Sequence, residues 1–593
     1  MKKLTFLCIA GIIAIIGCKE NIRISVNENP LSENKFIFRA KDESWKNLSL
    51  REKIGQTMMM LPDYETEKKI GNGSLEYFFE RYPVTGFFMG WKLYEGIEPE
   101  NWVDHLKKRA LEYQAASKLP LIFQEDYESG VWLKGMTPFP REMALGATDS
   151  PELAYKYGES VGLECRSIGV SWVLHPVADL NINPFNPIVN TRSVSDDPGK
   201  AVRLLSRQIA GLQNNGVAAT IKHFPGDGID YRDVHLVTAC MSLDMETWRK
   251  THGLVFQELI DEGIAAIMPG CITFPAYQKE KINDFYPPAA LSKELLTGLL
   301  KNEMGFQGVI ISDAVVMGGI RGYYESDLEN EVQSFLAGVD VLLWPSYAYM
   351  DTLEARINRG EIPMERLDDA VSRVWAMKER FGILDAKREV IREMSPQEKT
   401  NAHEASRAIA EKSLTLVRDR DNLLPLSVEQ GNKILLVAVT PKAIKGQDSD
   451  YKSMLNLKDL LIAKGFKVDF QRNVLYENDG WTENIYEKYD KLIFLVARNP
   501  HIPFGPLQFW DDEAQTVWGI NAMKKDKTIV ISLGSPYLMN EYFERVNCCI
   551  NAYSNNAATH EALIKALTGD IPFQGVSPVN LDMNVFNFNL RKQ

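Results

Sequence analysis

The chain has 593 residues, of which 45% are hydrophobic and 25% charged, a composition typical of a folded soluble protein. This length exceeds that of one ordinary domain, so we expect two or more buried cores. The formal net charge of −12 and the lack of a basic run argue against a nucleic-acid partner, because phosphate binding needs a concentrated positive surface. A neutral or weakly charged substrate fits this balance better.

Residues 1–18 are predicted to be a lipoprotein signal peptide. Met1, Lys2 and Lys3 give a positive start, an apolar stretch follows, and Gly17 precedes Cys18. This pattern is typical of an export signal rather than a spanning helix. Residues 15–18 resemble the bacterial lipobox, so we expect Cys18 to carry a lipid that anchors an exported protein to a membrane. Lys19 favours the outer membrane, and a plain secretory signal is the alternative.

After a predicted polar linker at 19–45, eight short apolar, β-rich runs recur between helical patterns in residues 46–386. They lie at 54–60, 85–89, 119–124, 171–176, 217–221, 264–268, 308–311 and 339–344. Buried strands that alternate with helices are typical of a parallel sheet. Eight of them favour a closed (β/α)8 barrel, whose active site lies at the carboxyl ends of the strands. An open, doubly wound sheet is the competing prediction.

A second domain is predicted for residues 402–593, after a charged linker at 387–401. Its strand-like runs lie at 414–417, 434–439, 467–470, 491–496, 528–533 and 548–552, and they alternate with helical patterns. This order indicates an α/β sandwich built on an open sheet. The sequence contains neither metal-ligand spacing nor a glycine-rich nucleotide motif, so we expect no metal and no organic cofactor.

Ionisable residues gather at the ends of the predicted strands. Residues 222–235 contain two histidines, a lysine and three carboxylates, held by glycines and a proline directly after the predicted strand at 217–221. We interpret this stretch as a loop that aims polar groups at a sugar. Asp233 is placed to hydrogen-bond His235 and hold its tautomer as a general acid/base. Asp126, Asp179 and Asp313 also follow or end predicted strands, where functional side chains of a barrel are expected.

Several segments in chain order resemble glycoside hydrolase family three, and in particular its β-N-acetylglucosaminidase branch. They are Asp-Tyr-Glu-Ser-Gly at 126–130, Thr-Pro-Phe-Pro at 137–140, the stretches at 143–148, 175–184 and 190–198, Lys-His-Phe-Pro-Gly at 222–226, Asp233-x-His235 and Ile-Ser-Asp at 311–313. The resemblance spans about residues 53–385, and residues 408–426 are similar to the start of the family's second domain. Together these segments are highly specific.

The resemblance implies roles for seven residues. Asp313 corresponds to the nucleophile that attacks the anomeric carbon in a retaining mechanism, and Asp233 with His235 corresponds to the acid/base dyad. The implied substrate contacts are Asp126, Arg192, Lys222 and His223, each of which could instead belong to a structural ion pair. Asp179 either contacts substrate or supports its loop.

Four positions depart from the branch. Val234 replaces a serine, Asp227 replaces a second histidine, Val194 replaces a phenylalanine, and Lys134 replaces an arginine. The change at Val234 removes a hydroxyl group but neither catalytic group of the dyad, and the other three changes bear on the identity of the sugar more than on the reaction.

The sequence therefore predicts an exported, lipid-anchored, retaining glycosidase that removes terminal β-linked N-acetylglucosamine from oligosaccharides or peptidoglycan fragments. The alternatives are a β-glucosidase or β-xylosidase of the same family, a phosphorylase, and a non-catalytic glycan-binding lipoprotein. The presence of Asp313, Asp233 and His235 argues against the last. The natural glycan and the oligomeric state do not follow from the sequence.

Overall fold

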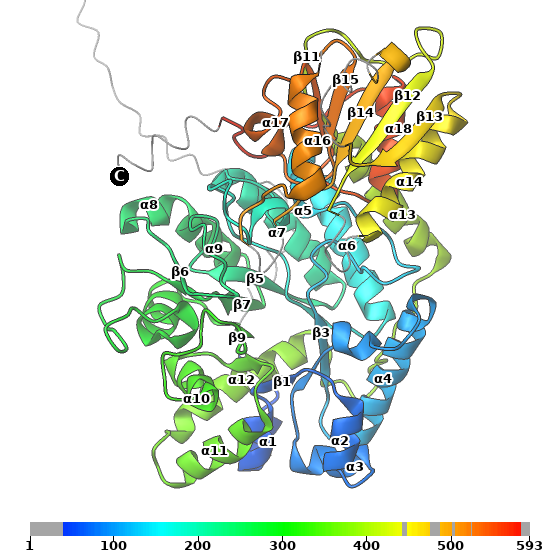
Figure 1. Ribbon diagram of the computed structural model, residues 1–593. Coiled ribbons are helices and arrows are strands. Elements are labelled where there is room, and N and C mark those ends of the chain that lie inside the picture. The colour runs from blue at the N-terminus through cyan, green and yellow to red at the C-terminus, as the bar shows by residue number, and fades with distance from the viewer. Residues whose placement is uncertain are drawn as a thin grey trace, which may run out of the picture.

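The structure is a computed structural model that describes residues 39–441, 448–474, 485, 487–500, 505–523 and 525–582. The predicted signal peptide with Cys18 and most of the predicted linker at 19–45 lie outside the described residues. Within the described ranges, no helix is long and apolar enough to cross a membrane. Figure 1 shows two parts, a barrel and an α/β domain that sits on one side of it.

The first part is a closed barrel of eight parallel strands, as predicted. Its strand order is β1-β10-β9-β7-β5-β4-β3-β2, and Met58 of β1 pairs with Leu342 of β10 to close it. The strands are β1 (Met58–Met60), β2 (Gly86–Phe88), β3 (Ile122–Glu125), β4 (Trp172–Val173), β5 (Ala218–Phe224), β7 (Ala266–Pro269), β9 (Val309–Ala314) and β10 (Val341–Leu343). The two-residue strands β6 (Ala239–Cys240) and β8 (Ile272–Thr273) form a separate small sheet.

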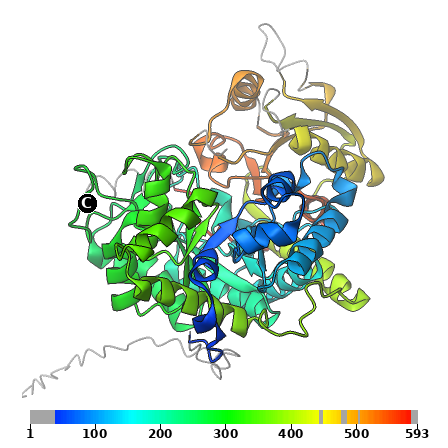
Figure 2. The same ribbon diagram turned by 90° about the horizontal axis from the view of Figure 1, so that it is seen from below.

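Helices surround these strands, as the view from below shows (Figure 2). They are α1 (Leu50–Gly55), α2 (Tyr64–Ile70), α3 (Leu75–Arg81), α4 (Trp102–Ala116), α5 (Glu142–Thr148), α6 (Pro151–Ser167), α7 (Pro198–Asn214), α8 (Met245–Lys250), α9 (His252–Asp261), the π-helical η6 (Glu294–Glu303), α10 (Asp327–Ala337), α11 (Tyr347–Asn358) and α12 (Met364–Arg380). The short 3-10 turns η2 (Trp91–Tyr94) and η4 (Asn190–Arg192) border the site described below.

Several predicted strand boundaries differ from the structure, and two of these differences have clear local reasons. The run at 54–60 begins inside helix α1, because Ser49 and Glu52 form a reciprocal capping box that starts a helix at Leu50. The run at 217–221 is too short, because strand β5 continues to Phe224. Lys222 and His223 therefore belong to a strand and not to the predicted loop, so the barrel itself fixes their backbone.

The C-terminal part is built on a six-stranded sheet in the order β11-β16-β15-β14-β12-β13, in which only β11 is antiparallel to its neighbour. The strands are β11 (Thr415–Asp419), β12 (Lys433–Val439), β13 (Lys467–Arg472), β14 (Lys491–Val496), β15 (Thr528–Ser532) and β16 (Cys548–Asn551). The helices are α13 (Pro396–Ser413), α14 (Asp448–Ala463), α16 (Asp511–Ala522), α17 (Leu538–Glu541) and α18 (Ala557–Leu567).

Both faces of this sheet are covered. Along β12, Ile434, Leu436 and Ala438 pack in one apolar cluster, while Leu435 and the other alternate residues pack in a second. A strand that is buried on both sides carries apolar residues at every position, which is why 434–439 stood out in the sequence. The predicted linker at 387–401 is partly wrong, because helix α13 already begins at Pro396, where Ser395 forms a capping box.

The two parts are docked through helix α5. Met143 and Ala147 of α5 share an apolar cluster with Tyr537 and Tyr553 of the C-terminal domain. The Tyr537 hydroxyl also donates to the backbone carbonyl of Asn181 at 3.0 Å. This contact places the C-terminal domain beside the loops that follow β4.

Glu142, the first residue of α5, has a buried carboxyl group. It accepts a hydrogen bond from Gln208 Nε2 at 2.9 Å, and His175 Nε2 lies 3.5 Å away. Burial raises the pKa of Glu142 to about 8 and lowers the pKa of His175 to about 3. Both groups are therefore neutral at pH 7, and their contact is not an ion pair.

This burial predicts a pH dependence of stability. The pKa of Glu142 rises on folding from an ordinary value of 4.5 to about 8. The stability that protonated Glu142 contributes to the folded protein is therefore complete below pH 4.5 and is lost as the pH rises to 8. Glu142→Gln, which cannot ionise, should escape this loss. The free energy of unfolding of the parent should fall relative to the variant by at most about 1.4 kcal/mol per pH unit.

Urea denaturation of both proteins across this pH range measures the difference. Glu65→Gln, an exposed change on helix α2, is the control and should follow the parent. Parallel pH curves for the parent and Glu142→Gln would contradict the prediction.

Candidate active site

A pocket of about 700 Å³ opens at the carboxyl ends of the barrel strands. Six of the seven predicted site residues line it, namely Asp126, Arg192, Lys222, His223, His235 and Asp313. The seventh, Asp233, does not line the pocket but contacts His235 directly. The barrel therefore brings together residues that lie up to 187 positions apart in the sequence (313 minus 126).

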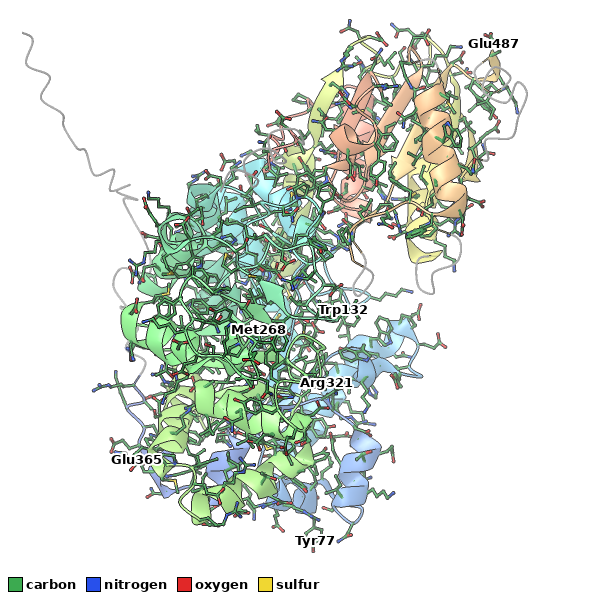
Figure 3. The ribbon with its side chains drawn as sticks, turned by 60° about the vertical axis from the view of Figure 1, so that its left-hand side comes forward. Tyr77, Trp132, Met268, Arg321, Glu365 and Glu487 are labelled. Atoms are coloured by element: carbon green, nitrogen blue, oxygen red, sulfur yellow. The ribbon has the colours of Figure 1, made fainter. Side chains whose placement is uncertain are left out.

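Figure 3 shows where the pocket lies. Trp132 and Met268, which both line it, are labelled in the middle of the view, whereas Tyr77 on the outer helix α3 lies at the bottom of the view. The C-terminal domain also reaches the pocket's surroundings, because Thr191 Oγ1 donates to Asn499 Oδ1 at 3.1 Å. Thr191 directly precedes the pocket residue Arg192.

Two cations and two carboxylates form a network on one side of the pocket. Lys222 Nζ lies 2.8 Å from Asp126 Oδ1 and 2.6 Å from Glu128 Oε1. Arg192 donates to both oxygens of Glu128, each at 2.7 Å, in the bidentate geometry that suits a guanidinium. The Lys222 side chain is 3% exposed and that of Asp126 is 48% exposed. The lysine therefore lies deep, while Asp126 is open to a ligand.

The charges in this network stabilise one another. Burial alone would raise the pKa of Glu128, but the charges and hydrogen bonds of Arg192 and Lys222 outweigh it and hold the pKa well below its usual value. Burial alone would lower the pKa of Lys222, and Asp126 and Glu128 reverse that effect. Glu128 and Lys222 therefore stay charged beside Arg192, and the two cations have donors that can bind sugar hydroxyl groups.

His223 is oriented by Asp179. The imidazole Nδ1 lies 2.7 Å from Asp179 Oδ2, and the backbone N–H of His223 donates to Asp179 Oδ1 at 2.9 Å. A carboxylate that accepts from Nδ1 fixes the tautomer and leaves Nε2 for a ligand. Asp179 does not line the pocket, so of its two predicted roles the structure favours support of the neighbouring residues.

Asp233 and His235 form the predicted dyad. Asp233 Oδ1 accepts from the backbone N–H of His235 at 2.9 Å and lies 2.8 Å from its Nδ1. The side chain of Asp233 is 2% exposed, whereas that of His235 is 35% exposed. A buried carboxylate thus holds an accessible imidazole, the arrangement required of a general acid/base whose conjugate acid must be stabilised.

The loop that carries His235 is fastened to the loop that follows Asp313. Gly318 N donates to the carbonyl of His235 at 2.9 Å, and Gly319 N donates to that of Val234 at 3.1 Å. A Cβ atom on Gly318 would come within 2.5 Å of a backbone oxygen of Leu236, so only glycine allows this approach. The backbone contact brings the dyad to the side of the barrel from which Asp313 projects.

Asp313 lies near the end of strand β9 and lines the pocket with a half-buried side chain. Its Oδ1 accepts from the backbone N–H of Ala314 at 2.8 Å. The preceding Ser312 is buried, and its hydroxyl accepts from the N–H of Leu343 on β10. Asp313 is thus a strand residue and not a helix cap.

Two further carboxylates belong to the site but were not predicted from the sequence. Glu128 belongs to the quoted Asp-x-Glu segment, yet its place as the shared partner of Arg192 and Lys222 depends on the folded barrel. Glu125, the last residue of β3, also lines the pocket with a buried side chain. Burial and the adjacent charge of Asp126 raise the pKa of Glu125. The signal in the sequence that could have indicated Glu125 is its position directly before Asp126, at the end of a predicted strand.

Three positions at which the chain departs from the branch do not line the pocket. Asp227 is buried and accepts from Asn186 Nδ2 at 2.7 Å, and Val194 is buried in the apolar core. Lys134 is exposed and pairs with Glu100. Any effect of these three residues on the choice of sugar would therefore pass through their neighbours.

The pocket therefore holds a carboxylate, a carboxylate-supported imidazole, and a network of hydrogen-bonding charges. The first can attack an electrophilic carbon and the second can move a proton. The third can orient a polyhydroxylated ligand.

Comparisons with known proteins agree with the chemistry inferred from the pocket. Residues 49–377, more than half of the chain, match the glycosyl hydrolase family 3 N terminal domain. The chain is 28% identical over 493 residues to a β-N-acetylglucosaminidase/β-glucosidase of Cellulomonas fimi, covering 79% of this chain and 85% of that protein.

Two solved structures are similar over nearly the whole chain. A β-glucoside phosphorylase has a TM-score of 0.78 and 27% identity, with 91% of this chain and 95% of that chain covered. A β-N-acetylglucosaminidase from Paenibacillus sp. has a TM-score of 0.72 and 27% identity, with 90% and 99% covered. The matched barrel contains the whole pocket, and the chain belongs to glycosyl hydrolase family 3 and is a glycoside hydrolase.

Proposed function

We propose that the chain removes terminal, β-linked N-acetylglucosamine from oligosaccharides and retains the anomeric configuration. The observation that carries this proposal is the Asp233–His235 dyad, which presents an imidazole in the same pocket as Asp313. A β-N-acetylglucosaminidase/β-glucosidase of Cellulomonas fimi and a solved β-N-acetylglucosaminidase from Paenibacillus sp. are the relatives that support it. Chitin-type oligosaccharides and peptidoglycan fragments are the substrates that contain this sugar.

In the first step the Asp313 carboxylate attacks the anomeric carbon while the bond from that carbon to the leaving oxygen breaks. His235, as the imidazolium, gives its proton to that oxygen, and the electron pair of the broken bond goes with it. The sugar is then bound covalently to Asp313. The Asp233 carboxylate supports the imidazolium before the transfer and fixes the ring throughout.

In the second step a water molecule attacks the anomeric carbon. Neutral His235 takes one proton from the water, the new carbon–oxygen bond forms, and the bond to Asp313 breaks. Two inversions give net retention, and the enzyme returns to its starting state. Asp126, Arg192, Lys222 and His223 hold the sugar hydroxyls through both steps.

A phosphorylase is the second candidate, favoured by the likeness to a solved β-glucoside phosphorylase. In that reaction phosphate, rather than water, takes the sugar from Asp313. A neutral imidazole repels an incoming phosphate less than a carboxylate would. The same pocket could therefore serve either acceptor, and the product separates them.

The proposal predicts the behaviour of two variants, made in protein that lacks residues 1–18. The parent should release nitrophenol from the β-N-acetylglucosaminide in preference to the β-glucoside. Asp313→Asn should lower kcat/KM by at least about a thousandfold, because the nucleophile is lost. His235→Ala should lower it by about a hundredfold or more, and further with a disaccharide, whose leaving oxygen needs a proton. His403→Ala, an exposed change outside the pocket, is the control.

Three other results would redirect the assignment. Preference for the glucoside would keep the family but reject the hexosaminidase. Formation of a sugar 1-phosphate on adding inorganic phosphate would identify the phosphorylase. Binding of the sugar without any turnover would support a glycan-binding protein.

We also propose that the protein is exported and anchored to the cell envelope, with the outer membrane favoured. Support comes from residues 1–18, in which a positive start, an apolar stretch and a lipobox-like segment end at Cys18. In bacteria fed labelled palmitate, the parent should carry the label and Cys18→Ser should not. Cys165→Ser, a change at a buried cysteine of the barrel, should stay labelled. Equal labelling of the parent and Cys18→Ser would contradict the anchor.

A further inference from the structure

A buried polar cluster lies behind the charged network, and the proposed chemistry does not use it. Its members are Glu142 on α5, Tyr157 on α6, Gln208 on α7 and His175 after β4, and each is at most 2% exposed. The three helices pack against one another on the side of the barrel that faces the C-terminal domain (Figure 1). Burying polar groups is costly, so the hydrogen bonds of this cluster have to offset that cost.

The hydroxyl of Tyr157 connects the two ends of the turn at residues 128–130. It donates to the backbone carbonyl of Glu128 at 2.9 Å and accepts from the backbone N–H of Gly130 at 2.9 Å. The aromatic ring is itself fixed, because it packs edge to face on Phe139 with centroids 4.9 Å apart. A single, rigidly held side chain therefore fixes this turn at two points.

The backbone around this turn needs such support. Tyr127 has a φ angle of +42° and Gly130 one of +79°, both in the left-handed region. A bulky residue rarely adopts this region, and it stays there only where the surrounding structure enforces it. The N–H of Tyr127 is held by Glu125 Oε2 at 3.0 Å on one side of the turn. Tyr157 holds the other side.

The turn carries Glu128, whose carboxylate binds Arg192 and Lys222 in the pocket. The pair with Arg192 is bidentate, a geometry that a shift of the backbone would disturb. Tyr157 does not line the pocket, so it can affect a ligand only through the groups that it holds. Its place in the structure is that of a positioning residue.

Glu142 lies behind the same hydroxyl. Burial and, after it, the charge of Glu142 hold the pKa of Tyr157 well above its usual value, so Tyr157 keeps its proton. A tyrosine hydroxyl has only one proton to donate. While Glu142 is neutral, that proton is free for the carbonyl of Glu128. An ionised Glu142 is a stronger acceptor than a carbonyl and competes for it.

The surroundings of Glu142 set the pH at which this competition begins. Burial raises its pKa to about 8, and the charge of Glu128 adds to the rise, against the hydrogen bonds of Gln208 and Tyr157. His175, 3.5 Å away, is neutral in this range because burial lowers its pKa to about 3. Glu142 is therefore neutral at pH 7 and ionises as the pH rises through 8.

We propose that Tyr157 positions the charged network for the sugar by holding the turn that carries Glu128, and that Glu142 controls this hold through the hydroxyl of Tyr157. Loss of the hold weakens sugar binding without touching the nucleophile or the dyad. This inference rests on the proposed function, because it takes the charged network as the seat of the sugar.

The first test is Tyr157→Phe, which keeps the ring and removes only the hydroxyl. The inhibition constant of N-acetylglucosamine should rise about tenfold, and kcat/KM for its nitrophenyl β-glycoside should fall by a similar factor, mainly through KM. A variant that is merely less stable would not show this rise, because an inhibition constant does not depend on the folded fraction. Tyr155→Phe, the same change at a partly exposed tyrosine of α6, is the matched control and should alter neither quantity.

The second test measures the same inhibition constant across pH. For the parent it should rise about threefold or more between about pH 7 and pH 9, and in Glu142→Gln, which cannot ionise, it should rise less. The substitution at Glu142 should have no such effect in the Tyr157→Phe background, because Glu142 acts through that hydroxyl.

An unchanged inhibition constant in Tyr157→Phe, or equal changes in Tyr157→Phe and Tyr155→Phe, would overturn the inference. Matching pH profiles of the parent and Glu142→Gln would reject the control by Glu142. If the parent prefers the glucoside, the proposed function fails, and the same comparison with glucose as inhibitor decides on Tyr157. A parent that neither sugar inhibits would overturn both the proposed function and this inference.

Discussion

The geometry of the pocket depends on one carboxylate, Glu128, which is bound at the same time by Arg192 and Lys222. Without it, two like charges would face each other in a place where Lys222 is almost fully buried. Removing one partner of a buried charge pair is strongly destabilising, because the remaining charge loses both water and its counter-charge. Glu128 thus fixes both cations before any sugar arrives, and it leaves the half-exposed Asp126 open towards the ligand.

Preorganisation of this kind recurs around the site. Asp179 holds His223 and Asp233 holds His235, and in each pair the carboxylate is buried behind the imidazole. The loop of His235 is in turn fastened to the loop after β9 by backbone hydrogen bonds from Gly318 and its neighbour. Groups that are already aimed at the reacting atoms need not be reorganised in the transition state.

Much of this arrangement could be predicted from the sequence. The barrel strands are buried on both sides, so their apolar runs are continuous and their number indicates the fold. The capping box of Ser49 and Glu52 overlaps the start of the apolar run at 54–60, and the helix that it starts takes the first residues of that run. The end of β5 was missed because Lys222 and His223 are polar, and only the closed barrel shows that they belong to the strand.

The site was predicted less completely, for a physical reason. Asp313 and the Asp233–His235 dyad could be found because the spacing of their motifs resembles a known family. Glu128 pairs with Arg192 and Lys222, and Trp91 packs against Trp344, through contacts between segments that are distant in the sequence. No local pattern encodes such contacts, so they emerge only when the barrel closes.

The central claim is that Asp313 forms the covalent intermediate. The most direct measurement uses a fluorinated N-acetylglucosaminyl substrate whose intermediate is released slowly, followed by mass spectrometry of the intact protein and of its peptides. The account predicts that the protein gains the mass of one sugar and that the modified peptide carries it on Asp313. Labelling of a different residue, or no labelling of a protein that turns over the ordinary substrate, would contradict the account.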